Sequence, residues 1–367
     1  MSIELKNVTK TFGEVAAVND VTFSVNEGEL MALLGPSGGG KTTVLRMIAG
    51  LEMPTSGDVF IRGQRVNDLS VQERNIGFVF QNYALFKNMN VFKNVAFGLK
   101  IKKWKRTDIK ARVAELLLLL GLEGLEKRYP HQLSGGQRQR VAIARALASK
   151  PSVLLLDEPF GAVDAKIRQE LREWLVTLHT ELNVTTIFVT HDQEEALEVS
   201  NRIVIFSRGN LEQVGVPREI YEQPANEFVA RFIGVMNVLD AEVQAGIARV
   251  NELQFPAQGQ PDGMRLRIGF RPYAVQISTD LSLYPYRAVL RRTYFLGIML
   301  RLELELPSGL VLRSRMTKEE YAQLGLEDRK EVSLQIRSYR VLANDAAGLP
   351  PEEDLKHEAP PSIAEHI

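Results

Sequence analysis

One short stretch constrains the fold of this chain more than any other. Residues 35 to 42 read Gly35-Pro36-Ser37-Gly38-Gly39-Gly40-Lys41-Thr42 and match the pattern G-x-x-x-x-G-K-[ST]. The continuous apolar run of residues 30 to 34 comes before it and predicts a strand covered on both faces, as in a parallel sheet. The apolar spacing of residues 44 to 48 comes after it and predicts a helix that stops at Gly50. Strand, glycine loop and helix in this order predict a phosphate-binding loop.

The residue types of this loop suit phosphate chemistry. Glycines let successive backbone N–H groups turn toward phosphate oxygens, and the helix N-terminus adds partial positive charge. Lys41 can reach the β- and γ-phosphates, and the Thr42 hydroxyl can ligate Mg²⁺. A purely structural glycine-rich turn is the alternative. The chain has no guanine-specificity motif such as N-K-x-D, which disfavours a GTPase.

Two further apolar runs deliver polar residues at their carboxyl ends. Residues 153 to 156 lead into Asp157 and Glu158, and residues 186 to 189 lead into Thr190 and His191. Buried strands of this kind predict an open α/β sheet that binds its ligand at one edge. Asp157 is placed to hold Mg²⁺, and Glu158 to polarise a water for attack on the γ-phosphorus. A helix cap or a solvated turn is the alternative for this carboxylate pair.

The pattern along the chain predicts several parts. Residues 83 to 149 are rich in helix signals, and in them Thr107 is expected to cap a helix that runs to Leu120. The character changes near residue 235, after which short segments with period 2 predict a small β-barrel or sandwich. From Asn344 onward four prolines and six acidic residues meet one lysine, which predicts a disordered tail.

Composition narrows the function classes. Lys and Arg total 45 and Asp and Glu total 45, so no bulk positive field favours nucleic acid or an anionic membrane. The chain has no cysteine, which excludes disulfides and Cys-ligated metals. The leucine runs are far shorter than the ~20 residues that cross a bilayer. If the protein works at a membrane, we expect another chain to span it.

A second motif carries a family resemblance. The run Leu133-Ser134-Gly135-Gly136-Gln137, with the carboxylate pair and His191 after it in order, resembles the signature of ABC ATPases. The resemblance implies the following fold: a P-loop NTPase ABC-ATPase domain of residues 1 to 235, with a helical subdomain of about residues 83 to 149. A smaller all-β, OB-like regulatory domain of residues 236 to 343 and a tail of residues 344 to 367 follow it.

The resemblance also implies roles for single residues. Phe12 matches the aromatic residue that stacks on adenine, Gln81 the glutamine that contacts Mg²⁺ and water, and His191 the switch histidine at the γ-phosphate. The Ser134 turn matches the element that binds the γ-phosphate of a partner's nucleotide. Gly161-Ala162-Val163-Asp164 replaces the more usual S-A-L-D, and Asp164 is retained.

Three groups of site residues follow. The expected catalytic residues are Glu158, His191 and Gln81, and the expected metal ligands are Thr42, Gln81 and Asp157. The expected nucleotide-binding residues are Phe12, Gly35, Ser37, Gly38, Gly39, Gly40, Lys41, Thr42, Thr43, Ser134, Gly135, Gly136, Gln137 and Asp164.

Elementary physics supports part of this assignment. Ser134 and the two glycines after it precede an apolar-periodic helix, so free N–H groups and a positive dipole end predict an anion site there. Because Lys41 already serves one phosphate site, the resemblance implies that this second anion site serves a partner's ATP, and two chains would then enclose two ATP molecules in an isologous homodimer. A lone Phe12 is otherwise more often a core residue. The four histidines other than His191 are most simply surface or helix residues.

The resemblance implies a machine as well. The apolar segment of residues 83 to 92 matches a groove for a short helix from each of two transmembrane permease subunits, with internal packing as the alternative. The resemblance also places the chain at the cytoplasmic face of the membrane, where it would interact with an extracytoplasmic solute-binding protein only indirectly, through the permeases. The β-rich part is similar to regulatory domains of sulfate/thiosulfate importers, with polyamine, sugar or iron importers as alternatives.

Two functions of other classes are the alternatives to an importer: a soluble ABC ATPase that acts on nucleic acid, and a non-catalytic ATP sensor. We expect ATP and Mg²⁺ as cofactors and no nucleic acid.

Overall fold

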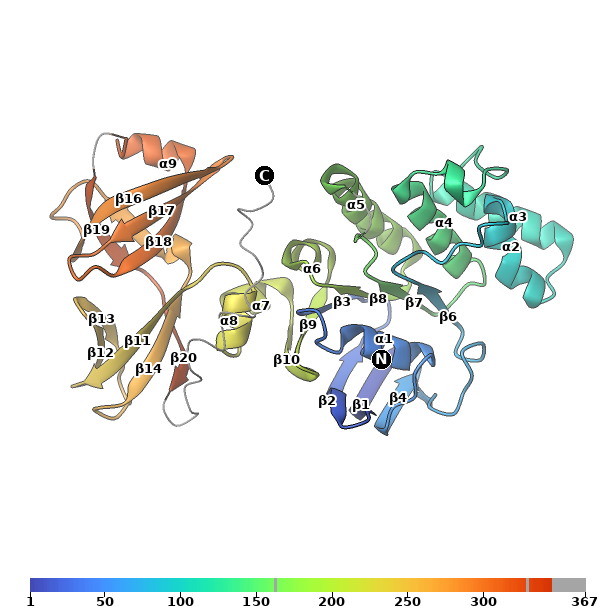
Figure 1. Ribbon diagram of the computed structural model, residues 1–367, viewed down its shortest axis with the longest axis horizontal. Helices are drawn as coiled ribbons and strands as arrows, with labels where there is room; N and C mark the ends of the chain where they lie inside the picture. Colours follow the sequence, from blue (N-terminus) through green and yellow to red (C-terminus); the bar gives the residue numbers. More distant parts are fainter. Residues whose placement is uncertain (162–163, 328–329, 345–367) are drawn as a thin grey trace. The chain divides into compact units, whose positions relative to one another are not determined.

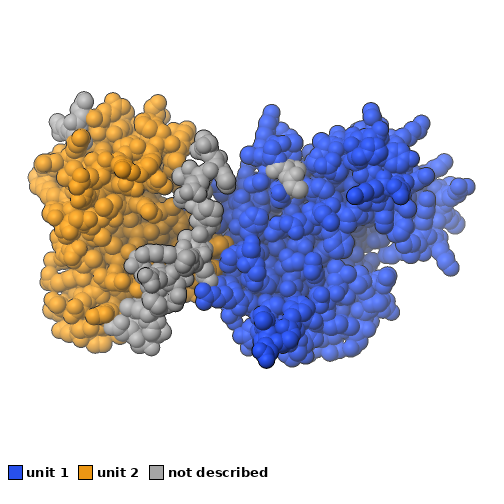
Figure 2. Space-filling view, in the orientation of Figure 1, with its two compact units in different colours: residues 1–223 blue, residues 224–367 orange. Residues whose placement is uncertain are grey.

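The chain folds into two units. The structure, a computed structural model, describes residues 1–161, 164–327 and 330–344. Unit 1 comprises Met1–Gln223 and unit 2 comprises Pro224–Ile367 (Figure 2). The boundary near residue 235 stays a prediction.

A six-stranded sheet forms the centre of unit 1 (Figure 1). Its order is β10 (Asn210–Gly215), β9 (Arg202–Ser207), β3 (Leu30–Leu34), β8 (Thr185–Thr190), β7 (Val153–Asp157) and β6 (Ile76–Val79). All neighbours are parallel except β10, which pairs antiparallel with β9. Every residue of β3, β7 and β8 is buried, as the continuous apolar runs predict. The predicted open α/β sheet is confirmed.

A second sheet of unit 1 lies across helix α1. Its antiparallel strands are β2 (Val15–Val25), β1 (Ile3–Phe12), β4 (Ser56–Ile61) and β5 (Gln64–Arg65), in that order. α1 (Lys41–Ala49) packs against β2 of this sheet and against β7 and β8 of the central sheet. Its buried Val44, Leu45 and Ile48 share one core with residues of both sheets. This packing fixes the N-terminus of α1, where the phosphate loop ends.

The helical part of unit 1 has a short list of elements: α2 (Val91–Ile101), α3 (Arg106–Leu119), the 3-10 turn η1 (Pro130–Gln132) and α4 (Gly135–Leu147). α2 and α3 both pack on α4. The expected cap of α3 was wrong, because Lys105 occupies the N-cap position and the Thr107 hydroxyl donates to Asp108 at 3.0 Å. Three helices complete the unit: α5 (Ala165–Leu182), α6 (Gln193–Val199) and α7 (Pro217–Glu222).

Unit 2 is built on two antiparallel sheets. The first has the order β13 (Leu253–Pro256), β12 (Ile247–Val250), β11 (Asn237–Gln244), β14 (Arg265–Phe270) and β20 (Arg340–Asn344). The second has the order β15 (Val275–Ser278), β19 (Glu331–Ile336), β16 (Tyr286–Leu296), β17 (Met299–Glu305) and β18 (Val311–Thr317). The short helices are α8 (Glu227–Phe232), η2 (Pro272–Ala274) and α9 (Lys318–Gln323). One apolar core joins the two sheets, and the β-rich prediction is confirmed.

The end of the described chain differs from expectation at one residue. Asn344 was placed at the start of the tail, but it closes β20 opposite Leu266. The rest of the predicted tail, residues 345 to 367, lies outside the described residues. In the described ranges, no helix has the length and apolar character that crossing a bilayer requires.

Candidate functional site

The phosphate loop joins β3 to α1 by a backbone that requires glycine. Gly38 and Gly40 have φ angles of 79° and 96°, in the region that other residues rarely adopt. A Cβ on Gly40 would lie 2.5 Å from the carbonyl oxygen of Ala17. Ser37 and Gly38 are exposed at the outer turn of the loop. The loop therefore presents backbone to solvent where an anion can approach.

Lys41 is the buried charge of this loop. Its side chain is 5% exposed, and its Nζ donates to the carbonyl oxygens of Gly35 at 2.7 Å and Pro36 at 2.8 Å. Burial lowers the pKa of Lys41, while the nearby carboxylates of Glu158 and Asp157 act in the opposite direction. The ammonium group is held at the loop by acceptors that phosphate oxygens can replace.

Asp157 lies at the end of β7, next to the start of α1. The Thr42 hydroxyl donates to its Oδ1 at 3.0 Å, which ties the helix to the strand end. Burial raises the pKa of Asp157, and the Thr42 hydrogen bond and the charge of Arg46 partly offset this effect. A desolvated carboxylate beside a hydroxyl is a pair of oxygen ligands that suits a hard cation.

Glu158, Gln81 and His191 form one connected group. The Gln81 amide donates to Oε2 of Glu158 at 2.8 Å, and Nδ1 of His191 lies 3.3 Å from Oε1 of Glu158. Glu158 has φ 45°, a left-handed conformation that is uncommon for glutamate, and its backbone N–H donates to Val189. The carboxylate thus has a fixed direction with one neighbour on each oxygen.

Sheet topology explains why these residues meet. β3, β8, β7 and β6 are parallel neighbours, so their carboxyl ends lie at one edge of the sheet. The phosphate loop follows β3, His191 follows β8, Glu158 follows β7, and Gln81 follows β6. Residues up to 156 positions apart in the sequence are therefore gathered at this edge, as open α/β sheets arrange their ligand sites.

The Ser134 turn starts α4. The Ser134 hydroxyl accepts from the Gln137 N–H at 3.2 Å, and the Gln137 side chain accepts from the Ser134 N–H at 2.9 Å. This capping box uses two of the N–H groups near the helix start, so those of Gly135 and Gly136 are the ones left for an anion. Within the described ranges, no hydrogen bond joins this turn to the phosphate loop of the same chain.

The remaining predicted residues lie on β1, on α1 and at the start of α5. Asp164 is the N-cap of α5 and accepts from the Ile167 N–H at 3.0 Å. Ala162 and Val163 lie outside the described residues. Phe12 is 50% exposed at the end of β1, with the Lys10 ammonium 4.8 Å from its ring centroid. Thr43 lies in the first turn of α1. Exposure of Phe12 contradicts the alternative of a core residue.

Two residues of the site escaped the sequence reasoning. Arg46 lies one helical turn after Thr42, and its charge stabilises the Asp157 carboxylate. The i, i+4 spacing from Thr42 was a signal that could have identified it. Glu195 is buried on α6 and hydrogen-bonded by Thr190, the residue before His191. Glu195 has no comparable signal in the sequence, because acidic residues are common in the first turn of a helix.

The segment of residues 83 to 92 is held by the helices around it. Arg145 on α4 donates to the carbonyl oxygens of Tyr83 and Ala84, at 2.9 and 2.7 Å. The buried Asn94 side chain bonds both the N–H and the carbonyl of Phe86. The Phe86 ring is 37% exposed and packs 4.5 Å from that of Phe97. The segment is thus partly internal packing and partly exposed apolar surface.

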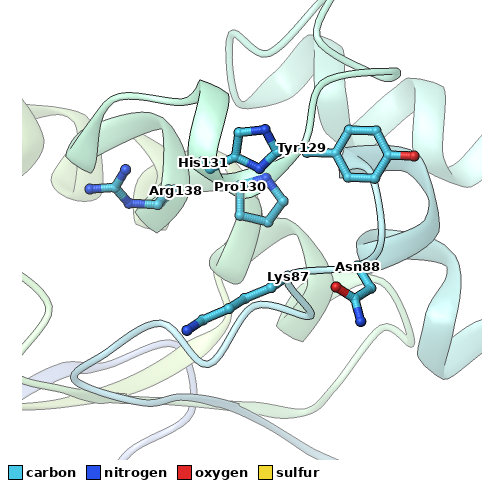
Figure 3. A pocket seen from close by; sticks show the side chains of 6 residues that line it. All are labelled: Lys87, Asn88, Tyr129, Pro130, His131 and Arg138. Atoms are coloured by element: carbon cyan, nitrogen blue, oxygen red, sulfur yellow. The ribbon is translucent and has the colours of Figure 1, made fainter.

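Two hollows flank this segment. The larger has a volume of about 650 Å³ and is lined by Lys87, Asn88, Tyr129, Pro130, His131 and Arg138 (Figure 3). The smaller has a volume of about 360 Å³ and is lined by Met89, Lys93, Phe97, Lys100 and Ile101. Both combine apolar walls with basic side chains. The larger also connects the segment after Gln81 to the residues just before Ser134.

Comparison with known proteins agrees with this geometry. The ABC transporter family matches residues 18–161. The sulfate/thiosulfate import ATP-binding protein CysA of Thermosynechococcus vestitus is 50% identical over 337 residues, which cover 92% of this chain and 97% of that protein. CysA of Nitrosomonas europaea is 46% identical over 356 residues, which cover 94% and 98%.

Solved structures resemble unit 1. The dimeric structure of MJ0796, a bacterial ABC transporter cassette, matches with a TM-score of 0.53 at 39% identity, over 59% of this chain and 99% of that one. The structure of cbiO1 from Clostridium perfringens, part of the ABC transporter complex cbiONQ, matches with a TM-score of 0.56 at 30% identity, over 60% and 90%.

Proposed function

Because this chain belongs to the ATP-binding proteins of ABC transporters, we propose that it energises the import of sulfate or thiosulfate. It is the ATP-binding and hydrolysing subunit of an importer. The observation that carries the catalytic part is the connected group of Gln81, Glu158 and His191 beside the phosphate loop. The solute rests on the relatives, which are named sulfate/thiosulfate import proteins.

ATP binding begins at the loop of residues 35 to 42. The backbone N–H groups of Gly38 and Gly40, with the α1 N-terminus, stabilise phosphate oxygens. The Gly39 N–H donates to the Pro36 carbonyl at 3.1 Å and shapes the turn, which gives the nucleotide access at Ser37. The Lys41 ammonium exchanges its two carbonyl acceptors for phosphate oxygens. The Phe12 ring is exposed and available to stack on adenine. Affinity would therefore come from the chain's own backbone and one buried cation.

The residues beside the loop fit Mg²⁺. The Thr42 hydroxyl and the Asp157 carboxylate already lie 3.0 Å apart, and burial raises the pKa of Asp157, so a cation there would stabilise the charged form. The Gln81 amide oxygen would be a third ligand from the same sheet edge, because the amide nitrogen donates to Glu158 and leaves the oxygen for the cation. A bound Mg²⁺ would neutralise charge on the β- and γ-phosphates.

Glu158 is the proposed general base. It takes a proton from the attacking water as the water oxygen bonds to the γ-phosphorus, and the bond from that phosphorus to the β-bridging oxygen breaks to release ADP. Gln81 and His191 hold the two oxygens of the carboxylate. With ATP bound, the second N–H of the Gln81 amide would donate to the water, and the His191 ring would contact the γ-phosphate. Two fixed neighbours keep Glu158 from rotating away from the reacting water.

A homodimer completes the site. The N–H groups of Gly135 and Gly136 at the α4 start suit the γ-phosphate of the partner's ATP, and Ser134 and Gln137 shape the turn. Asp164 fixes the start of α5, whose Ile167 methyl lies 3.3 Å from where a Gly136 Cβ would be. Two-fold symmetry then gives two equivalent ATP sites. ATP closes the dimer because it binds that state more tightly.

The permease subunits are the proposed partners at the segment of residues 83 to 92. A short helix from each permease would insert apolar side chains beside Phe86 and use the flanking hollows, of which Figure 3 shows the larger. This docking would hold the chain at the cytoplasmic face of the membrane. The solute-binding protein would act on it only through the permeases.

The decisive experiment uses the complete importer. We expect ATPase activity of the chain with its permeases in proteoliposomes to rise when a solute-binding protein loaded with sulfate or thiosulfate is added. Loaded maltose-, spermidine- and iron-binding proteins serve as controls. Stimulation by one of these instead would refute the solute while leaving the ATPase assignment intact. Absence of ATP hydrolysis in every arm would refute the ATPase assignment.

A further inference from the structure

Three neighbouring strands of unit 2 share an outward face that is rich in arginine. β16, β17 and β18 pair side by side in that order (Figure 1). Buried residues alternate with exposed or half-buried ones along β17 and β18, so the second set points away from the core. Register groups the outward residues into three rows: Leu296, Met299 and Thr317; Tyr294, Arg301 and Arg315; Arg292, Glu303 and Arg313.

The glutamates of this face are already matched by arginines. Glu303 lies between Arg292 and Arg313 in the register. Beyond the β-bulge in β16, Glu305 forms an ion pair with Arg291. The row of Tyr294, Arg301 and Arg315 contains no acid. The surplus positive charge of the face therefore gathers in that row.

Arg301 and Arg315 face each other across adjacent strands. The β-carbons of such pairs lie about 5 Å apart, and like charges in this position destabilise a sheet. The Arg301 guanidinium carbon lies 4.2 Å from the Tyr294 ring centroid, and Arg292 contacts the Tyr294 hydroxyl at 3.5 Å. In the described ranges, the buried Nε of Arg301 has no acceptor, and no carboxylate forms an ion pair with Arg301 or Arg315.

Protection of a sheet edge explains only part of this arrangement. β18 is an edge strand, and charged residues such as Arg313 and Arg315 hinder pairing with other chains. Arg301 lies on β17, which is paired on both sides. Protection of the edge therefore does not explain Arg301, which stacks on Tyr294 and faces Arg315.

We infer that Arg301 and Arg315, with Arg292 beside them, bind a divalent tetrahedral oxyanion such as sulfate or inorganic phosphate. Guanidinium groups donate pairs of N–H groups to oxyanions, and four oxygens can serve two arginines at once. The Tyr294 ring holds Arg301 in place, so little side-chain freedom is lost on binding. The anion also removes the repulsion between the facing arginines.

The test is titration of the full chain with sodium sulfate and sodium phosphate. Because the phosphate loop also binds such anions, both arms carry Lys41→Ala, and sodium chloride at matched ionic strength measures screening. We expect one sulfate or phosphate per chain, and about a tenfold or greater loss of affinity in the Arg301→Gln/Arg315→Gln variant, the scale of losing charged hydrogen bonds. The matched control is Arg287→Gln, which removes an exposed charge from β16, the strand of Arg292, and should leave affinity unchanged.

Stability without the anion gives a second measurement. Arg315→Gln should keep or raise the unfolding midpoint in chloride, because the like-charge pair is lost, and sulfate should no longer raise it. A fall of the midpoint in chloride would assign a structural role to Arg315 and contradict the inference. Equal responses to sulfate and chloride, or binding of an oligonucleotide with none of sulfate or phosphate, would also overturn it. When Lys41 is kept, the arginine variants should hydrolyse ATP at the rate of the natural chain. This inference can therefore fail while the proposed function stands, and the reverse.

Discussion

Glu158 is fixed by its surroundings at the scale of single atoms. A glutamate with φ 45° adopts a conformation that costs of order 1 kcal/mol or more, and the backbone bond to Val189 and the contacts with Gln81 and His191 hold it there. Such strain at the end of a buried strand is typical of a residue whose direction matters. In the proposed mechanism, this direction points the carboxylate at the attacking water.

Glu158→Gln should lower ATP turnover by at least ~10²-fold, the scale of a lost acid or base, while ATP binding persists. The amide keeps the size of the side chain but cannot take the proton. Phosphate release and nucleotide binding measure the two effects. Glu181→Gln, at an exposed position of α5, is the control. Turnover that stays within twofold of the natural chain would refute the general-base role.

Gln81→Ala and His191→Ala should each reduce turnover, and the double variant should lose less than the product of the two. Both residues act on the same Glu158 carboxylate, so their effects are coupled rather than independent. A double-mutant cycle on the hydrolysis rate measures the coupling. Strictly multiplicative losses would show that the two residues do not act through Glu158.

The sequence identified most of these residues because each follows a strand or loop with a recognisable pattern. Lys41, Asp157 and Glu158 are of this kind. Arg46 and Glu195 were missed, because their roles depend on which side chains the fold places beside them. The two neighbours of Glu158 were named by family resemblance, and only the sheet order gives the physical reason that they meet it.

At the scale of elements, the start of α4 combines a helix cap with a proposed ligand site. Ser134→Ala removes the capping box, which should cost about 1 kcal/mol of stability, and should also weaken ATP-driven dimerisation. Thr317→Ala removes a comparable capping box from α9 and is the matched control. Denaturation and light scattering with ATP are the measurements. Equal dimerisation in the two variants would contradict a role of the Ser134 turn in binding the partner's ATP.

The first turn of α6 should make unit 1 sensitive to pH. Burial raises the pKa of Glu195 from 4.5 to about 7. Between these values the folded state holds a proton that the unfolded state has lost, so stability falls as pH rises from about 4.5 to 7 and is constant above that. Relative to Glu195→Gln, the natural chain should lose about 3 kcal/mol across this window.

Urea unfolding at pH 5, 6, 7 and 8 tests this expectation. The two tryptophans, Trp104 and Trp174, both lie in unit 1, so their fluorescence reports on that unit. Glu194→Gln, at the exposed neighbouring position, keeps Glu195. The difference in its free energy of unfolding from the natural chain should therefore be the same at every pH. A difference between the natural chain and Glu195→Gln that does not change with pH would contradict the raised pKa.

Elements with a strong period were predictable, and so was the end of α1 at Gly50, but other ends were not. The runs of β3, β7 and β8 appear where the sequence placed them, because burial on both faces dictates the pattern. The start of α3 was misplaced, since Thr107 bonds its neighbour Asp108 instead of a helix N–H. Pairing order and register, including the arginine row of β16 to β18, depend on contacts that a single sequence does not show.

At the scale of the whole molecule, energy must pass from ATP to the permeases. Phe86→Ala should leave basal ATP hydrolysis intact and uncouple it from transport, because the ring is 37% exposed on the proposed docking segment. Solute uptake per ATP in proteoliposomes measures coupling. Phe188→Ala, at a fully buried position of β8, shows what loss of folding looks like. A Phe86 variant that behaves like it would support the alternative of internal packing.

The two guanidinium bonds from Arg145 to Tyr83 and Ala84 give α4 a mechanical meaning. This helix of 13 residues is a rod about 20 Å long, with Arg145 near one tip and Ser134 at the other. If the docking segment tilted, α4 would rotate as a rigid body and its Ser134 end would be displaced. A conformational change in the permease would thereby alter the contacts of the partner subunit's ATP. The phosphate loop of the chain that contacts the permease would not have to move.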